Sequence, residues 1–265
     1  MIRFALAVLA VVAAQPVRAG VILQYEDDEK KQTTVELDGK KLRSFSPDHG
    51  KPTAIFDGDQ NVFYMLDDKD KSYRRIDETS GTQLSKGLQD AMEKAKARMS
   101  PEQRAQMEAY LAKQQGTQTA TAPKEHTFTF EKAGGSQKVA GYACDNYRVL
   151  RDGTLEDEGC FVPWQAGVLS RADLEAFKEM GRFFEKTFAT MNEGHGPRTP
   201  WANGWITHFV DSAPGFPVTM DRIDKDGKKS HEMHLVKLER TTLVASRFSP
   251  PPDYREKPML PGGGQ

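Results

Sequence analysis

The chain has 265 residues, of which 37% are hydrophobic and 28% are charged, so its length and composition suit a folded globular body. Its 37 Lys and Arg residues nearly balance its 38 Asp and Glu residues, which gives a formal net charge of -1. This balance argues against a nucleic-acid partner, because no excess of cations is available to neutralise a phosphate backbone.

The N-terminus has the pattern of a secretory signal peptide. Arg3 provides a positive charge, residues 4–14 are apolar, and small residues stand at Val17 and Ala19, where a signal peptidase reads the chain. We expect cleavage between Ala19 and Gly20, which would leave a soluble, periplasmic mature protein. The apolar stretch is shorter than the about 20 residues that a spanning helix needs, so we expect no transmembrane span after cleavage.

Short segments with high strand propensity follow the cleavage site. Asp38-Gly39 is a hairpin signal between two of these segments. Residues 62–66 are apolar on both alternating faces, which is typical of a strand covered on both sides. We expect these segments to form an antiparallel meander. The expected strands are residues 21–25, 33–37, 41–45, 53–56, 62–66 and 72–76.

Residues 84–123 are expected to form a helical insert followed by a linker. Apolar residues recur at helical spacing over residues 84–99. The sequence Ser-Pro-Glu-Gln at residues 100–103 is typical of a helix N-cap with a capping box, which predicts a second helix. Residues 114–123 are rich in Gln, Thr and Ala without an apolar period, which predicts the linker.

The chain's two cysteines, Cys144 and Cys160, lie in a second β-rich region on either side of an Asp152-Gly153 turn. In an exported protein this arrangement predicts a structural disulfide between neighbouring strands. A reactive or metal-binding pair is the alternative, although a close Cys-x-x-Cys spacing and a nearby His are both missing. The expected strands of this region are residues 126–131, 139–150 and 160–162.

The most apolar helix is expected to begin after Ser170. Its stripe at three- and four-residue steps includes Phe177, Phe184 and Phe188. Such a stripe usually packs into the core, and it also suits the wall of a ligand site. Both interpretations stay open, with these three phenylalanines as candidate ligand-binding residues.

The last elements are expected to be strands and a tail. Asp224 to Gly227 is a turn signal between two of the strands. Residues 255–265 end in Gly and Pro and are expected to form a flexible C-terminal tail. No break in composition divides the mature chain, so we expect a single domain over residues 20–254. The expected strands are residues 206–210, 217–224, 231–239 and 242–248.

No motif specifies an enzyme, a cofactor or a metal. His231 and His234 are three positions apart rather than four, and on a strand they point to opposite faces. Residues 57–61 resemble the start of a calcium loop, but Val62 occupies the place where that loop requires Gly. Neither a Gly-x-Ser-x-Gly elbow nor a Gly-rich phosphate turn is present. We therefore predict no catalytic residue, no cofactor and no enzymatic activity.

Several short motifs occur together along the mature chain, at residues 55–59, 64–69, 100–107, 141–144, 160–164 and 248–254. In this order they resemble an uncharacterised bacterial exported domain of unknown function, which is similar in outline to the periplasmic lipoprotein carriers, the LolA/LolB-like half-barrels. The resemblance implies an α+β fold in which a strongly curved, mostly antiparallel sheet has helices packed on its concave side. It also implies a hydrophobic hollow, which accepts acyl chains in the carriers.

Three hypotheses for function follow; the last, which no motif supports, is a hydrolase with a polar cleft. In the first, the protein binds a lipid, an acyl chain or another hydrophobic ligand in the half-barrel cavity. In the second, it is an envelope protein-interaction or stress-sensing module without a small ligand.

Overall fold

The structure is a computed structural model of the whole chain, and it describes residues 19–45, 50–80, 82–83, 86–87, 93, 99–103, 127–193, 205–224 and 226–259. Most of the predicted signal peptide, residues 1–18, lies outside the described residues. So do most of the predicted insert and its linker. The part of the insert that is described confirms the capping box, because the Ser100 hydroxyl accepts a hydrogen bond from the Gln103 N–H at 3.2 Å. The Gln103 side chain accepts one in return from the Ser100 N–H at 3.1 Å.

The described residues form one sheet of twelve strands in the order β12-β6-β5-β4-β3-β2-β1-β11-β10-β9-β8-β7. All neighbouring strands are antiparallel except β12 and β6, which are parallel. The prediction of a mostly antiparallel, sheet-rich fold is therefore confirmed. The strands are β1 (Gly20–Glu26), β2 (Gln32–Asp38), β3 (Lys41–Phe45), β4 (Pro52–Asp57), β5 (Val62–Asp67), β6 (Ser72–Ile76), β7 (Phe128–Val139), β8 (Tyr142–Arg151), β9 (Thr154–Pro163), β10 (Gly215–Ile223), β11 (Lys229–Thr241) and β12 (Arg255–Glu256).

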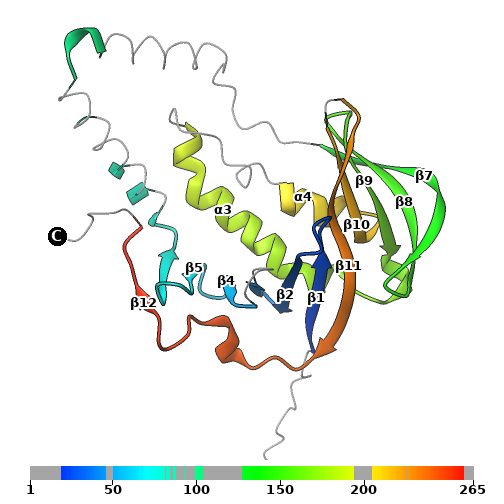
Figure 1. Cartoon of the computed structure of the whole chain (residues 1–265), viewed down its shortest axis with the longest axis horizontal. Coiled ribbons are helices and arrows are strands. Elements are labelled where there is room, and N and C mark those ends of the chain that lie inside the picture. The colour runs from blue at the N-terminus through cyan, green and yellow to red at the C-terminus, as the bar shows by residue number, and fades with distance from the viewer. Residues whose placement is uncertain are drawn as a thin grey trace, which may run out of the picture.

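The sheet bends around two helices, α3 (Glu175–Glu193) and α4 (Trp205–Ser212) (Figure 1). Both helices lie on its concave side, α3 over β1 to β6, which we call the first meander, and α4 against β7. Short 3-10 turns, η1 (Trp164–Ala166) and η2 (Arg171–Leu174), connect β9 to α3. Among the described residues, no helix combines the length and the apolar character that a membrane crossing requires.

Tight turns set the register of β7, β8 and β9, which we call the second meander. Ala140 and Gly141, between β7 and β8, have φ of 48° and 90°, and Asp152 and Gly153, between β8 and β9, have φ of 51° and 81°. Two consecutive residues with positive φ are typical of the type I′ hairpin turn, whose twist matches that of paired strands. The predicted turn at Asp152-Gly153 is thus confirmed. The predicted strand over residues 139–150 is wrong at its start, because Ala140-Gly141 is a turn and β8 begins at Tyr142.

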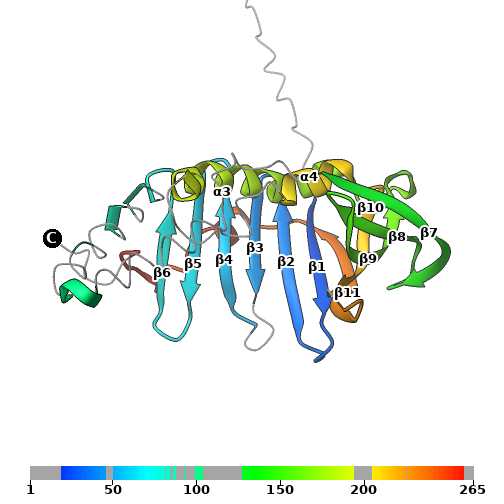
Figure 2. The same cartoon turned by 90° about the horizontal axis from the view of Figure 1, so that it is seen from above.

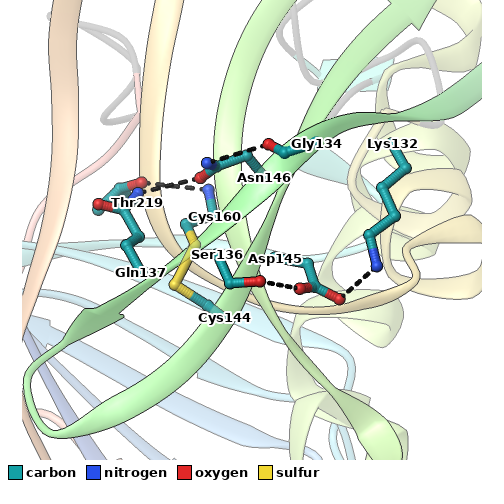
Figure 3. The surroundings of a disulfide bond; sticks show 9 residues. All are labelled: Lys132, Gly134, Ser136, Gln137, Cys144, Asp145, Asn146, Cys160 and Thr219. Atoms are coloured by element: carbon teal, nitrogen blue, oxygen red, sulfur yellow. Dashed lines mark hydrogen bonds and ion pairs between the residues drawn. A yellow bond between two sulfur atoms is a disulfide. The ribbon is translucent and has the colours of Figure 1, made fainter.

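The disulfide prediction is confirmed: Cys144 on β8 and Cys160 on β9 are bonded, with their Cα atoms 5.5 Å apart (Figure 3). Both cysteines are buried. Thr219 of β10 holds the adjoining backbone, because its hydroxyl accepts a hydrogen bond from the Cys160 N–H at 3.1 Å. A bridge that closes a loop of this length contributes about 3 kcal/mol in the chain-entropy description.

Two predicted strands are wrong. Residues 206–210 belong to α4, because a short apolar run fits a buried helix as well as a strand. Residues 242–248 contain the 3-10 turn η4 (Ala245–Phe248) instead of a strand. There the chain leaves the sheet and crosses its convex side, where the Phe248 side chain is buried.

We call residues 242–257 the C-terminal strap. Arg247 of the strap forms two hydrogen bonds with the buried carboxylate of Glu36 on β2, one of them at 3.0 Å. The strap ends in β12, which pairs with β6 through Arg255 and Glu256. These two residues lie inside the range predicted to be a flexible tail, and their pairing places them at the edge of the sheet.

Candidate functional site

The concave face of the first meander carries its side chains in rows across the strands. Because alternate residues of a strand share a face, the strand register decides which side chains become neighbours. The row nearest α3 is large and apolar throughout, and it closes this end of the concave face. It consists of Val21, Leu37, Leu42, Phe56, Phe63 and Ile76.

Helix α3 packs on this row. The ring centroids of Phe183 and Phe56 are 5.6 Å apart, and those of Phe184 and Phe63 are 5.0 Å apart. Figure 2 shows α3 crossing the strands at one end, and among the residues that the structure describes no helix covers the opposite ends of these strands. The helix therefore roofs only part of the concave face.

The next row contains two small side chains. Ser44 of β3 and Ala54 of β4 are paired in the register, and they lie between Val35 and Met65. Small residues at these positions leave space that α3 does not fill. The result is a cavity of about 780 Å³, within the range of about 300–1,000 Å³ typical of small-molecule sites.

The cavity wall is mainly apolar. Contributions come from the first meander, α3, α4 and the β10-β11 pair, so segments far apart in sequence share one space. The lining residues are Tyr25, Glu26, Asp27, Thr33, Val35, Leu42, Ser44, Ala54, Phe63, Met65, Ile76, Leu174, Phe177, Met180, Phe184, Phe209, Val210, Phe216, Pro217 and Met233.

The structure places the candidate ligand-binding residues along α3. Phe177 and Phe184 both line the cavity. Phe184 is buried against Phe63, whereas Phe177 is only partly buried. Phe188 belongs to the same helix, but its side chain lies outside the described part of the structure.

The cavity is polar at the end remote from α3. Tyr25 of β1 and Thr33 of β2 are direct register partners there, beside the turn that joins the two strands. Glu26 accepts a hydrogen bond from the Lys30 ammonium at 2.8 Å, and this interaction lowers the pKa of Glu26. Burial raises the pKa of the Tyr25 hydroxyl above its ordinary value, so this hydroxyl stays protonated in neutral solution.

The turn resembling a calcium loop is held by its own hydrogen bonds. Asp57 Oδ1 accepts from the N–H groups of Asp59 at 3.0 Å and Gln60 at 3.3 Å, and Asp57 Oδ2 accepts from the Lys41 ammonium at 3.0 Å. These contacts describe a capped turn. Within the described ranges, no group of His, Cys, Asp and Glu side chains suits a metal ion.

Sequence reasoning missed Tyr25, Thr33, Ser44 and Ala54. The sequence shows which strand face each of them shares, because each lies two positions from an apolar residue of the same strand. Only the register shows that they meet.

Comparison with known families matches residues 75–254 to the family described as Domain of unknown function (DUF4412). The chain belongs to this family. The matched segment begins within β6 and ends shortly before β12, so the strands β1 to β5 that form much of the cavity precede it.

A solved structure, an uncharacterized conserved protein from Thermus thermophilus, is similar over 91% of both chains, with 8% sequence identity and a TM-score of 0.41. No curated protein matches the chain.

Proposed function

We propose that this protein is a periplasmic binding protein that holds a lipid, an acyl chain or another apolar ligand in the cavity between its sheet and α3. The observation that carries the proposal is the cavity itself, which has about 780 Å³ of space behind a mainly apolar wall. An apolar ligand of matching size gains free energy by leaving water for such a wall.

The side chains of the wall support this proposal. Met65 lines the cavity and is 46% exposed, although its side chain is large and apolar. Met180 and Met233 also line the space, and methionine adapts to ligands of irregular shape. Exposed apolar surface in a concave site is costly in water unless a ligand covers it.

The expected compartment fits the same proposal. The N-terminal sequence predicts export with cleavage before Gly20, which is the first residue of β1. The Cys144–Cys160 disulfide suits an oxidising space such as the periplasm. The resemblance to the LolA/LolB-like half-barrels adds a precedent for acyl chains inside a curved sheet, and we extend that half-barrel architecture to this chain as part of the proposal.

The test uses protein purified from the periplasm of cells that express the full chain. Native mass spectrometry followed by solvent extraction should find an apolar molecule bound to a polypeptide that begins at Gly20. Ligand-free protein should bind N-phenyl-1-naphthylamine, a neutral dye whose emission rises in apolar surroundings. Ala54→Phe, which fills the cavity, should reduce dye affinity at least about tenfold.

Ala143→Phe is the matched control, because Ala143 is exposed on β8 and does not line the cavity. This variant should bind the dye as the wild type does. The proposal is wrong if the wild-type protein carries no apolar molecule and binds no dye, or if both variants bind dye equally well. The envelope protein-interaction hypothesis would then be the better one.

A further inference from the structure

The charges around the cavity select among apolar ligands. Among the residues that the structure describes, those lining the cavity include two carboxylates, Glu26 and Asp27, and no Lys or Arg. A ligand with an anionic head group would therefore enter without a cation in the wall to pair with it. Burying a charge without a partner costs far more than burying a neutral polar group.

Both carboxylates already have local partners. Glu26 pairs with Lys30. Asp27 Oδ1 accepts hydrogen bonds from the N–H groups of Glu29 and Lys31, both at 2.9 Å. Lys30 offsets the charge of Glu26 and two backbone N–H groups solvate the carboxylate of Asp27, so both side chains hold the β1-β2 turn.

The remaining polar groups at this end are neutral hydroxyls. Tyr25 and Thr33 lie opposite each other on β1 and β2, and both line the cavity. Within the described part of the chain, the Tyr25 hydroxyl makes no hydrogen bond. A tyrosine hydroxyl at the boundary of an apolar space normally has a hydrogen-bond partner, so this one is available to a ligand.

We propose that the preferred ligand is a neutral amphiphile, an acyl chain joined through an ester or amide to an uncharged head group. The chain lies along Phe177, Ala54 and Met65, and the carbonyl oxygen accepts hydrogen bonds from Tyr25 and Thr33. This inference rests on the proposed function and adds the class of ligand to it. Fatty-acid anions and cationic amphiphiles with the same chain are the disfavoured alternatives.

The test compares three probes with the same alkyl length: 1-monolauroylglycerol, laurate and dodecyltrimethylammonium. Each is titrated against dye-loaded full-length mature protein at neutral pH, below its micelle concentration. The neutral ester should bind at least about tenfold more tightly than either charged probe. Tyr25→Phe should weaken binding of the ester by about two- to tenfold, which is the effect of one hydrogen bond, and leave laurate binding unchanged.

Tyr64→Phe is the matched control. Tyr64 lies on the opposite face of β5 from Phe63 and Met65, with its ring 5.7 Å from that of Tyr73, so removing its hydroxyl should change no affinity. Circular dichroism of all variants checks that they are folded.

The outcomes separate this inference from the proposed function. If no probe displaces the dye and the dye itself does not bind, the proposed function fails. If laurate or the cationic probe binds as tightly as the ester, the cavity binds apolar chains but the neutral-head-group inference is wrong. It is equally wrong if Tyr25→Phe weakens all three probes to the same extent.

Discussion

The two halves of the sheet use their concave faces differently. In the half formed by β7 to β10, the space is filled by aromatic rings, with Phe161 at 5.6 Å from Phe130 and 6.2 Å from Phe209 between ring centroids. In the half formed by β1 to β6, the row containing Ser44 and Ala54 leaves a cavity, which extends to the edge of the filled half at Phe209. Neighbouring strands are antiparallel in both halves, so the difference lies in side-chain size at the inward positions.

This comparison shows how one sheet can provide stability in one region and a site in another. The filled half also contains the Cys144–Cys160 bridge and has the close packing that makes a core rigid. The open half has its helix at one end of the strands only. We therefore expect substitutions in the two halves to separate stability from ligand binding.

The largest effect is expected for Phe161→Ala. The Phe161 side chain is 1% exposed within the filled half, so its removal leaves a cavity and should lower the free energy of unfolding by about 3–5 kcal/mol. Phe177→Ala removes an equally large ring that is only partly buried beside the existing cavity, and it should cost less than half as much. Urea unfolding of both variants measures the difference. Equal losses would contradict the division into a filled and an open half.

A second pair adds volume instead of removing it. Ala213→Leu places a larger side chain at a residue that is 1% exposed in the filled half, and overpacking there should cost about 1–3 kcal/mol. Ala54→Leu extends into the cavity, so its unfolding free energy should stay within about 0.5 kcal/mol of the wild type or rise. Thermal and urea unfolding check both values. A loss at Ala54 as large as that at Ala213 would show that the cavity is not available space.

The smallest expected effect concerns the start of the helix that roofs the open half. Burial raises the pKa of Asp173, but hydrogen bonds from Arg240 and from the Ser170 N–H and hydroxyl outweigh it and lower the pKa to about 2. A carboxylate whose pKa is lower in the folded state stabilises the fold above its unfolded pKa, and this contribution disappears as the pH falls toward 2. We expect a contribution of about 1 kcal/mol at neutral pH.

Asp173→Asn tests this contribution through the pH dependence of unfolding. Between about pH 4 and pH 2, wild-type stability should fall more steeply than that of the variant. At pH 7 the variant should be less stable by about 1 kcal/mol. If the unfolding free energies of the two proteins change with pH in parallel, Asp173 is not the cause of acid sensitivity in this region.

Particular residues show where sequence reasoning succeeded. Asp152-Gly153 indicated a tight turn because positive φ is easy for Gly and tolerated by Asp, and the structure has it. The two cysteines on either side of that turn indicated a bridge between β8 and β9, which is present. The stripe with Phe177 and Phe184 indicated an apolar helix, which is α3. All three signals are local, so a single sequence contains them.

Other residues show where it failed. Residues 206–210 were expected to form a strand, and residues 242–248 likewise, but the first segment is helical and the second crosses the convex side of the sheet. A short apolar run fits a strand or a buried helix, and the segments that pack against it decide which one forms. Phe248 is buried by strands that lie far from it in sequence, and Arg247 meets Glu36 across the fold.

By itself, the sequence determined the mostly antiparallel sheet, the disulfide and the amphipathic helix, since strand alternation, turn residues and helical spacing are properties of neighbouring positions. Only the tertiary structure decided that Ser44 and Ala54 lie side by side next to the part of the sheet that α3 covers. It also decided that Tyr25 lies opposite Thr33 at the end of the cavity remote from α3. A cavity is the space left between side chains from distant segments. Its volume and its polarity therefore depend on how those segments pack.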